Sequence, residues 1–343
     1  MTDLLNMNGK LRICYGTCNP ALGKAVVEHL NLPGTEVILK AQQFADGEIL
    51  TDYDSTLRGC DLFIVQPVSV PDVNAALMEL LLAIDAAKRA CAARVTAVIP
   101  YYGYARQDRK AKMRQPISAK VVADMLTAVG VNHVVSIDIH TQQIQGFFSA
   151  SVPLDFIPGD MIFLPALCKL YKETKFMVAS TDAGGAARCR ELAHKFNTDI
   201  AIVDKKRNYD AMNQSDVMSV IGDVTGRNVV IYDDMCDTAG SLCKAAAAIK
   251  RAGAVKVFGC VTHAVLSADA AQKIRDSVFD QVFFSDTIHI PDEKLAVMGK
   301  ITIISCAEIL ATVVRVIHLE ESLGNYIQCQ KELVAKLIND ECQ

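Results

Sequence analysis

The chain lacks the features that mark secreted, membrane-spanning and nucleic-acid-binding proteins. Its most apolar stretches are interrupted by charged residues, among them Glu79, Asp85 and Arg315. The start, from Met1 to Lys10, has no basic segment followed by an apolar run, so neither a secretion signal nor a membrane span is predicted. A formal net charge of -4 argues against a general nucleic-acid binder. If the ligands are anionic, positive charge must therefore be concentrated locally.

Cysteine is frequent but is not arranged as a metal or redox motif. None of the 12 cysteines forms a C-x-x-C pair, and the closest two are Cys14 and Cys18. Most are therefore expected to be buried small apolar residues in a reducing compartment. We predict a cytoplasmic protein.

Two common phosphate-binding motifs are also missing. The segment from Gly16 to Lys24 ends in Gly-Lys, but six residues separate Gly16 from Gly23, and Ala25 stands where a P-loop requires a hydroxyl. No G-x-G-x-x-G follows a predicted strand, so dinucleotide binding is not supported.

The chain does contain a regular alternation of short β-rich runs and helical segments. With 343 residues, 51% of them hydrophobic and 22% charged, it is long enough for two α/β domains. The predicted strands are Leu11–Tyr15, Glu36–Leu39, Leu62–Pro67, Val95–Pro100, Val134–Ile139, Phe176–Ser180, Ile200–Val203, Val229–Tyr232, Val257–Thr262, Val282–Phe284 and Ile301–Ile304. The predicted helices include Asn74–Cys91, Ser118–Val129, Ala186–Phe196, Leu242–Ala252 and Ala307–Leu319. This alternation predicts an α/β fold of mainly parallel sheets flanked by helices.

A change of pattern near the middle of the chain predicts a domain boundary. Pro153, Pro158 and Gly159 interrupt the alternation there. Both halves carry acids where a predicted strand ends, at Asp138 in the first and Asp233 in the second, which indicates two related domains. Ligands of open parallel sheets collect at the carboxyl ends of the strands, so these loops are the expected binding sites.

The segment from Val229 to Ser241 predicts a site for a sugar phosphate. Four β-branched or aromatic residues form a strand that ends in Asp233 and Asp234, and a loop of small residues leads into an Ala- and Lys-rich helix. The helix N-terminus offers backbone N–H groups and a partial positive charge to a phosphate, while the acids accept hydrogen bonds from sugar hydroxyls. The alternative is an ordinary strand-to-helix turn capped by Asp237 or Thr238.

A cationic loop follows another predicted strand. Residues 101–110 place tyrosines before Arg106, Arg109 and Lys110. Aromatic faces beside arginine suit a nucleotide base and its phosphates. The alternative is a solvated charged loop.

Three further strand ends carry groups that bind metals or phosphates. His140 follows Asp138 by two residues and could ligate a divalent cation, although a lone histidine is more often structural. Asp182 lies in a small-residue turn between a strand and a helix. The run from Asp204 to Arg207 holds three cations and offers positive charge to a phosphoryl group in transit.

Together these segments resemble the ribose-phosphate pyrophosphokinase family, also called phosphoribosyl pyrophosphate synthetases. The resemblance extends from about Leu11 to about Leu323. The matching motifs are Phe44-Ala45-Asp46-Gly47-Glu48, Gly103-Tyr104-Ala105-Arg106-Gln107-Asp108, Gln142-Gln143-Ile144-Gln145-Gly146-Phe147-Phe148, Asp182-Ala183-Gly184-Gly185, Lys205–Arg207, Asp233–Ser241 and Thr262-His263. Their number and their order carry the resemblance, rather than any one of them.

The resemblance implies two tandem phosphoribosyltransferase-like domains, over 1–157 and 158–306. A helix over 307–323 is expected to pack on the first domain, and 324–343 to form a helical tail. The implied reaction transfers the β,γ-diphosphoryl group of ATP to the anomeric hydroxyl of ribose 5-phosphate, with Mg2+ as cofactor, for nucleotide biosynthesis. The resemblance also implies a homo-oligomer in which dimers build a hexamer.

The resemblance also assigns roles by motif. ATP binding is implied for Phe44, Asp46, Glu48, Arg106 and Gln107. His140 and Asp182 match metal-linked residues, and Lys205 and Arg207 match catalytic cations. Binding of ribose 5-phosphate is implied for Arg207, Asp233, Asp234, Asp237, Thr238, Ala239, Gly240 and Ser241.

Two other functions share parts of this pattern. A phosphoribosyltransferase would use the Asp233–Ser241 loop, but it needs only one such domain and has no use for the Arg106-Gln107 motif. A non-catalytic, synthetase-associated regulatory subunit would keep the fold, but such relatives typically alter the Lys205–Arg207 segment. Because Lys205 and Arg207 are both present, an active enzyme is predicted.

Overall fold

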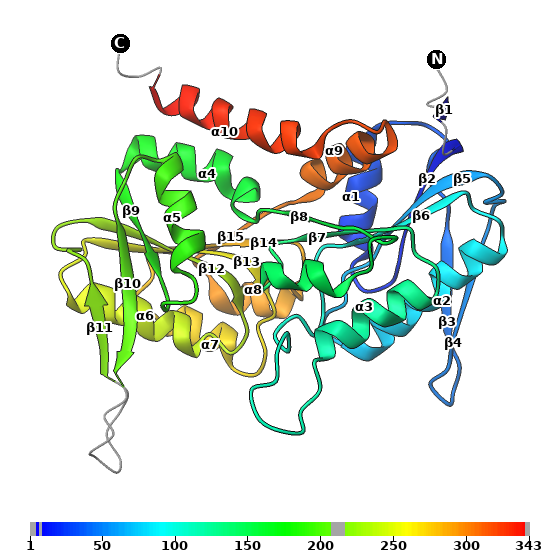
Figure 1. Cartoon of the computed structure of the whole chain (residues 1–343). Helices are drawn as coiled ribbons and strands as arrows, with labels where there is room; N and C mark the ends of the chain where they lie inside the picture. The colour runs from blue at the N-terminus through cyan, green and yellow to red at the C-terminus, as the bar shows by residue number, and fades with distance from the viewer. Residues whose placement is uncertain (1–4, 7–8, 207–216, 340–343) are drawn as a thin grey trace. The chain divides into compact units, whose positions relative to one another are not determined.

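Two α/β units make up the part of the chain that the computed structural model describes, which is residues 5–6, 9–206 and 217–339 (Figure 1). Unit 1 runs to Pro158 and takes in Thr287–His289 and Ser305–Leu323. Unit 2 holds Gly159–Asp286, Ile290–Ile304 and the chain from Gly324 onward. Each unit has one main sheet that is largely parallel, as the alternation of strands and helices predicts.

The described strands of the unit 1 sheet follow the order β1-β2-β5-β6-β7-β8, and only β1 and β2 pair in antiparallel fashion. They are β1 (Leu5–Asn6), β2 (Gly9–Tyr15), β5 (Cys60–Val65), β6 (Arg94–Ile99), β7 (His133–Ile137) and β8 (Leu154–Ile157). A separate antiparallel hairpin is formed by β3 (Leu39–Gln43) and β4 (Ile49–Tyr53). The helices are α1 (Pro20–Leu30), α2 (Val73–Arg89), α3 (Ser118–Ala128), the 3₁₀ helix Gln142–Phe147 and α9 (Ala307–His318).

Helices cover both faces of the unit 1 sheet, with α2 and α3 on one side and α1 and α9 on the other (Figure 1). This arrangement explains why every residue of β5 is buried. The late helix α9 buries Leu310, Val313, Val314 and Ile317, which recur at helical spacing. A helix that follows unit 2 in the sequence therefore completes the core of unit 1.

A buried ionic cluster fixes the end of α9 to the sheet. The Asp61 carboxylate of β5 accepts hydrogen bonds of 2.7 and 2.6 Å from the Arg94 guanidinium of β6. His318 Nδ1 lies 2.7 Å from Asp61 Oδ2, and Arg94 also donates to the carbonyl of Ile317 at 3.1 Å. Asp61 and His318 are completely buried, so this cluster joins three elements in the interior of unit 1.

The described strands of the unit 2 sheet follow the order β11-β10-β9-β12-β13-β14-β15, and only β10 and β11 are antiparallel. They are β9 (Phe176–Ser180), β10 (Ile200–Lys206), β11 (Val217–Ile221), β12 (Asn228–Cys236), β13 (Lys256–Ala264), β14 (Gln281–Ser285) and β15 (Ile301–Ile304). The helices are α4 (Asp160–Glu173), α5 (Ala186–Lys195), α6 (Gly240–Arg251), α7 (Ala270–Asp276), α8 (Asp292–Met298) and α10 (Leu323–Asn339). In Figure 1, α4 and α5 lie on one side of this sheet and α6 and α7 on the other.

The two sheets share one topology. Five parallel strands occur in the same order in each, β2-β5-β6-β7-β8 in unit 1 and β9-β12-β13-β14-β15 in unit 2. In both units an antiparallel hairpin follows the first of the five, β3–β4 in unit 1 and β10–β11 in unit 2. The hairpin stays apart from the sheet in unit 1, whereas β10 pairs with β9 in unit 2.

Several predicted strand bounds are wrong. The predicted strand Glu36–Leu39 is not found, because Glu36 makes only an isolated bridge to Ile13 and β3 begins at Leu39. The strand predicted to reach Ile139 stops at Ile137, because Asp138 has a φ of 42°, which a strand cannot accommodate. The strands β4, β8 and β11 were not predicted, and the ends of the predicted helices shift by one or two residues.

Other expectations from composition agree with the fold. Seven of the described cysteines are buried, namely Cys14, Cys60, Cys168, Cys189, Cys236, Cys260 and Cys306. None of the described helices combines the length and apolar character that crossing a membrane requires.

Candidate active site

The acid pair of unit 2 lies within β12 rather than after it. The prediction that the strand stops before Asp233 is wrong, because the parallel ladder with β13 continues through Asp233 as far as Cys236, which pairs with Ala264. Asp234 is buried, at 5% exposure, and Asp233 is half-buried. The strand backbone therefore holds both carboxylates on a rigid element.

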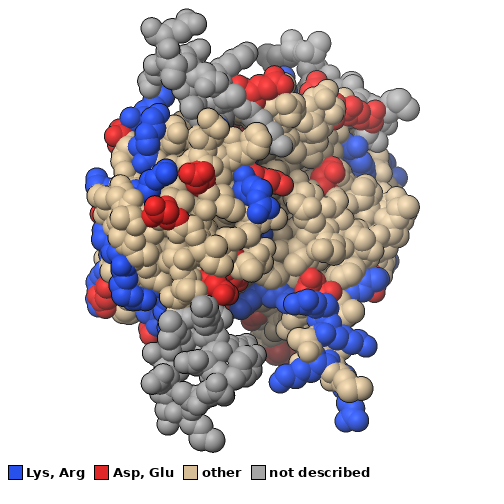
Figure 2. All heavy atoms as spheres, turned by 60° about the vertical axis from the view of Figure 1, so that its left-hand side comes forward, with Lys and Arg blue, Asp and Glu red and all other residues tan. Residues whose placement is uncertain are grey.

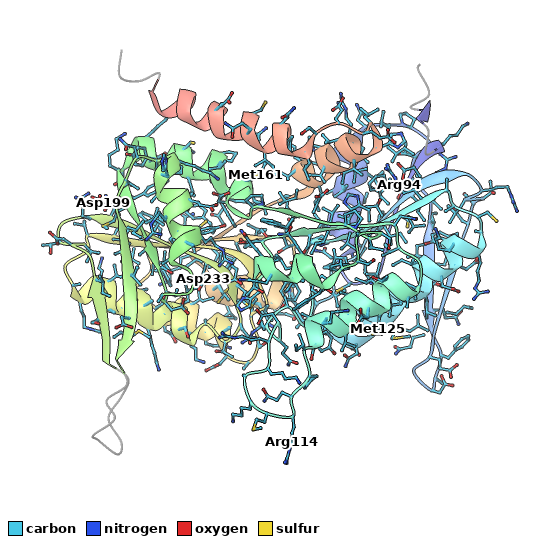
Figure 3. The ribbon with its side chains drawn as sticks, viewed as in Figure 1. Arg94, Arg114, Met125, Met161, Asp199 and Asp233 are labelled. Atoms are coloured by element: carbon cyan, nitrogen blue, oxygen red, sulfur yellow. The ribbon has the colours of Figure 1, made fainter. Side chains whose placement is uncertain are left out.

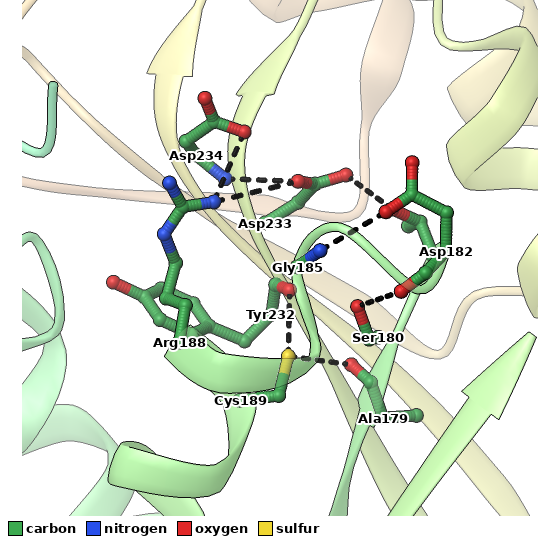
Figure 4. A network of polar contacts seen from close by, with 10 residues as sticks. Ala179, Ser180, Asp182, Gly185, Arg188, Cys189, Tyr232, Asp233 and Asp234 are labelled. Atoms are coloured by element: carbon green, nitrogen blue, oxygen red, sulfur yellow. Dashed lines mark hydrogen bonds and ion pairs between the residues drawn. The ribbon is translucent and has the colours of Figure 1, made fainter. Parts of the chain in front are cut away.

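Side chains from a neighbouring loop and helix surround the pair (Figure 4). The Thr181 hydroxyl donates to Asp233 Oδ2 at 2.7 Å, and the backbone N–H of Asp234 donates to Asp233 Oδ1 at 3.0 Å. One guanidinium nitrogen of Arg188 lies 3.1 Å from Asp234 Oδ1 and 3.9 Å from Asp233 Oδ1. The pair is thus bracketed by a hydroxyl on one side and a cation on the other.

This environment perturbs the ionisation of the pair. Burial and the adjacent charge of Asp234 raise the pKa of Asp233 well above its ordinary value, and the hydrogen bond from Thr181 and the charge of Arg188 oppose the shift. Carboxylates that are costly to ionise are typical of functional sites.

The loop that carries Asp182 lies beside this pair, since Thr181 belongs to it. Asp182 Oδ1 accepts a 3.0 Å hydrogen bond from the Gly185 N–H, and its carbonyl accepts one of 2.7 Å from the Ser180 hydroxyl. A Cβ atom on Gly185 would come within 2.6 Å of the Ser180 hydroxyl oxygen, so a larger residue there would have to displace the Ser180 side chain that bonds the turn. Asp182 itself is exposed. The structure therefore brings together Asp182 and the acid pair, which lie far apart in the sequence.

The small-residue loop after β12 is held in a defined shape. Ala239 has a left-handed φ of 59° and is the N-cap residue of α6, which begins at Gly240. The carbonyl of Asp237 accepts from the Ser267 N–H at 2.9 Å, and the carbonyl of Thr238 accepts from Lys273 Nζ at 3.2 Å. These hydrogen bonds hold the loop at the N-terminus of α6, and a helix N-terminus is a favourable position for an anion.

One of the two predicted catalytic cations lies on a described strand of unit 2. Lys205 lies on β10, where its backbone is paired with Met218 of β11. Arg207 lies outside the described residues.

In unit 1, three predicted nucleotide-binding residues form the turn between β3 and β4. The Phe44 N–H donates to the Glu48 carbonyl at 2.8 Å, and Asp46 Oδ1 accepts from the Glu48 N–H at 3.1 Å. All three side chains are exposed, and Phe44 is 46% accessible. An apolar ring at this exposure is available to a flat ligand such as a nucleotide base.

The other predicted nucleotide-binding residues lie on the long loop between β6 and α3. Gln107 is tied to the start of α3, because its side-chain oxygen accepts from the Ser118 hydroxyl and its carbonyl accepts from the Ala119 N–H. Asp108 Oδ2 accepts a 2.9 Å hydrogen bond from the Thr141 hydroxyl. The loop that carries Arg106 and Gln107 is thereby joined to the loop that carries the exposed His140.

This long loop also concentrates positive charge. Its exposed cations are Arg106, Arg109, Lys110, Lys112 and Arg114. Figure 3 shows Arg114 at the tip of the loop, and Figure 2 shows Lys and Arg side chains on a projecting segment of the surface as well as elsewhere on this face. The local concentration of cations expected for anionic ligands is therefore present despite the net negative charge.

Comparison with known protein families identifies relatives of the chain. A model described as the N-terminal domain of ribose phosphate pyrophosphokinase matches residues 11–130, and one described as the phosphoribosyl synthetase-associated domain matches residues 177–328. The ribose-phosphate pyrophosphokinase of Helicobacter pylori is 43% identical over 313 residues, which cover 91% of this chain and 94% of that protein. The chain belongs to the ribose-phosphate pyrophosphokinase family.

Other relatives support the same family and its fold. The ribose-phosphate pyrophosphokinase of Vibrio parahaemolyticus is 45% identical over 316 residues, covering 92% of this chain and 98% of that protein. The crystal structure of phosphoribosylpyrophosphate synthetase from Mycobacterium smegmatis matches with a TM-score of 0.82 at 34% identity, covering 90% of this chain and 98% of that one. The predicted family, its enzymatic nature and the fold of two tandem phosphoribosyltransferase-like domains are thus confirmed.

The donor groups of the site suit Mg2+ bound together with phosphates. Among the described residues, no cluster of three or more His, Cys, Asp or Glu side chains is arranged to hold a metal ion. Mg2+ does not require such a cage, because it commonly binds through one or two carboxylates, substrate phosphates and water. The exposed carboxylate of Asp182 is a hard oxygen ligand of this kind.

Three residues of the site escaped prediction from sequence, namely Thr181, Arg188 and Lys273. Each contacts a predicted site residue across a long separation in the chain, such as the 52 residues between Thr181 and Asp233. Arg188 lies in the first turn of α5 after the Asp182-Ala183-Gly184-Gly185 motif. Its proximity to that motif is the one local signal that could have indicated it.

Proposed function

We propose that the protein transfers the β,γ-diphosphoryl group of ATP to the anomeric hydroxyl of ribose 5-phosphate. The products are phosphoribosyl pyrophosphate and AMP, and the role is in nucleotide biosynthesis. The observation that carries the proposal is the grouping, in unit 2, of the acid pair, the Asp182 turn and the small-residue loop at the start of α6. Membership of the family supports this reaction.

Ribose 5-phosphate binds in unit 2. Its phosphate occupies the loop Asp237, Thr238, Ala239, Gly240 and Ser241, where backbone N–H groups and the dipole of α6 favour an anion. Its ring hydroxyls donate to Asp233 and Asp234, whose burial makes them avid acceptors once ionised. Arg207 contributes a further contact to the sugar phosphate.

ATP binds through residues of unit 1. The Phe44 ring stacks on the base, Asp46 and Glu48 accept hydrogen bonds from the base or its ribose, and Arg106 and Gln107 hold the phosphates. The attachment of the Arg106 loop to α3 and to the His140 loop supports this role, because it limits the conformations of the loop before ATP arrives. In an oligomer the nucleotide site is shared between subunits.

The reaction is an in-line displacement at the β-phosphorus. The anomeric oxygen forms a bond to that phosphorus as its bond to the α,β-bridging oxygen breaks, and AMP departs with the bridging oxygen. The proton of the hydroxyl leaves to solvent. Lys205 and Arg207 offset the charge that shifts onto the phosphates and the leaving group, so positioning and electrostatics supply most of the acceleration.

Mg2+ is the proposed cofactor, with His140 and Asp182 as the protein groups linked to it. When bound, it neutralises part of the phosphate charge. We expect turnover to stop in excess EDTA and to return when Mg2+ is restored, and undiminished turnover in EDTA would contradict the cofactor assignment.

The direct test is an assay for AMP with purified protein, ATP, Mg2+ and ribose 5-phosphate. AMP formation that depends on ribose 5-phosphate and is largely lost in the Lys205→Ala variant supports the proposal. AMP no higher than in that variant would overturn it.

An alternative that shares the fold is a non-catalytic regulatory subunit of a synthetase, and the matched C-terminal family model is described as a synthetase-associated domain. The relatives of this chain are named as enzymes, which favours catalysis over this alternative. A regulatory subunit would bind the substrates without releasing AMP, and would change the activity of a catalytic partner when mixed with it. The AMP assay on the protein alone therefore separates the two candidates.

Homo-oligomeric assembly and a cytoplasmic location complete the proposal. Dimers that build a hexamer would have about six times the mass of the 37.3 kDa chain. Measurement of mass in solution by light scattering tests this, and a monomeric mass at assay concentration would contradict it.

A further inference from the structure

Arg188 lies next to the acid pair of unit 2, at the start of a helix that is packed against the sheet. It follows Ala186 and Ala187 in the first turn of α5, and its side chain is 22% exposed. The next residue, Cys189, is completely buried, and its thiol donates to the carbonyls of Ala179 and Tyr232 at 3.4 and 3.2 Å. These contacts join the start of α5 to β9 and to β12, the strand that carries the acids (Figure 4).

The geometry gives Arg188 a definite electrostatic task. Its guanidinium is 3.1 Å from Asp234 and 3.9 Å from Asp233, while the two carboxylates are neighbours in one strand. Two carboxylates this close and this buried repel each other, and without a cation they tend to share a proton. A protonated carboxyl is a poorer acceptor for a sugar hydroxyl than a carboxylate.

We propose that Arg188 is a positioning residue for the sugar site: its guanidinium offsets the negative charge of the acid pair and orients Asp233 and Asp234 to accept hydrogen bonds from the ribose hydroxyls. Arg188 acts through the acids and does not touch the reacting atoms. The inference rests on the proposed function, because it takes ribose 5-phosphate to be the ligand of these acids.

The Thr181 hydroxyl supports the same arrangement from the opposite side. It donates to Asp233 Oδ2, whereas Arg188 approaches Oδ1 of each acid. Thr181 and the Asp234 N–H thus hold Asp233 at both oxygens. The guanidinium lies 3.9 Å from Asp233 Oδ1 and 3.1 Å from Asp234 Oδ1, so Arg188 supplies charge to both acids and contacts Asp234 more closely. Loss of the guanidinium removes that charge.

The test compares three variants with the wild type. Arg188→Met keeps a long side chain but removes the charge, and Arg188→Lys keeps the charge but loses the planar fork. Arg190→Met, at an exposed position of the same helix, is the matched control. The dissociation constant of ribose 5-phosphate is measured by calorimetry, and KM and kcat are measured for both substrates.

In Arg188→Met we expect the affinity for ribose 5-phosphate to fall roughly 10- to 100-fold, the loss typical of a hydrogen bond to a charged group. The KM for ATP should change less than about twofold, because the ATP residues belong to unit 1. Arg188→Lys should recover most of the affinity, and Arg190→Met should behave as the wild type. In an Asp234→Asn background, the Arg188→Met loss should be smaller, because the acid with which Arg188 interacts is already neutral.

An unchanged affinity for ribose 5-phosphate in Arg188→Met would overturn the inference. Equal weakening of both substrates, together with a lowered melting temperature, would assign Arg188 a structural role and would also overturn it. If Arg188→Met does not fold, the same comparison is made with Arg188→Gln. Wild-type protein that binds ribose 5-phosphate but forms no AMP would refute the proposed reaction alone, since the binding constants would still decide the role of Arg188.

Discussion

The acids on the related sheets of unit 1 and unit 2 have different surroundings. In unit 1, Asp61 is saturated by the chain itself, through Arg94 and His318. In unit 2, Asp233 and Asp234 lie on β12, which takes the place of β5 in the order of parallel strands. Thr181 and Arg188 lower the pKa of Asp233, but burial and the charge of Asp234 raise it by more, so it stays above its ordinary value. The first arrangement pairs a buried acid with an arginine and a histidine of the chain, whereas the second leaves an acid that is costly to ionise, as is typical of functional sites.

The loops after the first parallel strand show the same contrast. In unit 1 the loop after β2 is occupied by Glu79, which is 4% exposed and accepts from the Thr17 N–H at 2.7 Å and from its hydroxyl. The buried Gln66 side chain accepts from the next N–H, that of Cys18, at 3.3 Å. In unit 2 the corresponding loop after β9 carries the exposed Asp182. The chain's own side chains fill the loop in unit 1, so a common topology need not give both units an anion site.

The largest expected effect comes from opening the ionic cluster of unit 1. Asp61→Asn removes the charge that balances Arg94 beside the buried His318, and loss of one partner of a buried ion pair costs about 3–5 kcal/mol of unfolding free energy. Denaturant unfolding monitored by circular dichroism measures it. The control is Asp85→Asn, which breaks the exposed Asp85–Arg89 pair and should cost less than about 1 kcal/mol. If both variants lost equally little unfolding free energy, the Asp61 cluster would not be a major stabilising feature of unit 1.

The next largest effect is a loss of kcat on substitution in the hairpin of unit 2. The unit 1 hairpin carries Asp46 and Glu48 in its turn, whereas Lys205 lies on the unit 2 hairpin. Lys205→Ala should lower kcat by roughly 10²–10³-fold, the loss typical of one transition-state donor. Lys206→Ala, at the next position of the strand, is the matched control and should stay within a fewfold of wild type. A near-normal rate of AMP release in Lys205→Ala would refute its catalytic role.

Strands and site motifs that depend on contiguous residues can be predicted from the sequence. The strands Phe176–Ser180 and Ile301–Ile304 were predicted with their observed bounds, because apolar runs bordered by turn residues define them. The motifs of the candidate site were also recognisable, since each is contiguous. Their grouping in unit 2 follows from a parallel sheet, which brings the carboxyl ends of strands to one edge.

The remaining features depend on contacts that no local pattern encodes. The β3–β4 hairpin was missed because β3 reads Leu-Lys-Ala-Gln-Gln, in which no residue is fully buried. The extension of β12 through two acids was missed because carboxylates are rare inside strands, and only the ladder with β13 maintains them there. Arg188 and Thr181 acquire their roles when α5 and the loop before it meet β12.

A smaller effect is expected for Asp233, where loss of the charge should stabilise the protein, whereas the same change at Asp61 should destabilise it. Because the folded pKa of Asp233 is raised, the folded state binds a proton more tightly than the unfolded chain, and stability falls as pH rises from about 4 through the folded pKa. Asp233→Asn should therefore stabilise the protein by about 1–2 kcal/mol at pH 8 and have little effect at pH 5, while weakening ribose 5-phosphate binding.

Melting temperatures across this pH range, measured in EDTA, test the prediction. The control is Asp199→Asn, whose carboxylate is 76% exposed beside Arg227 and which should show no such trend with pH. A destabilised Asp233→Asn at pH 8 would mean that the acids of unit 2 are structural, like Asp61, and the contrast between the units would disappear.

The smallest effect concerns the link between the two loops of unit 1. Thr141→Val removes the hydroxyl that donates to Asp108 and so weakens the link between the Arg106 loop and the His140 loop. Loss of one hydrogen bond of about 1 kcal/mol corresponds to an increase of roughly fivefold in the KM for ATP, with the KM for ribose 5-phosphate unchanged. Thr127→Val, which removes a hydroxyl bonded to the Ala123 carbonyl within α3, is the control and should leave both constants unchanged. If Thr141→Val instead weakens ribose 5-phosphate and spares ATP, the assignment of nucleotide binding to unit 1 and sugar binding to unit 2 must be revised.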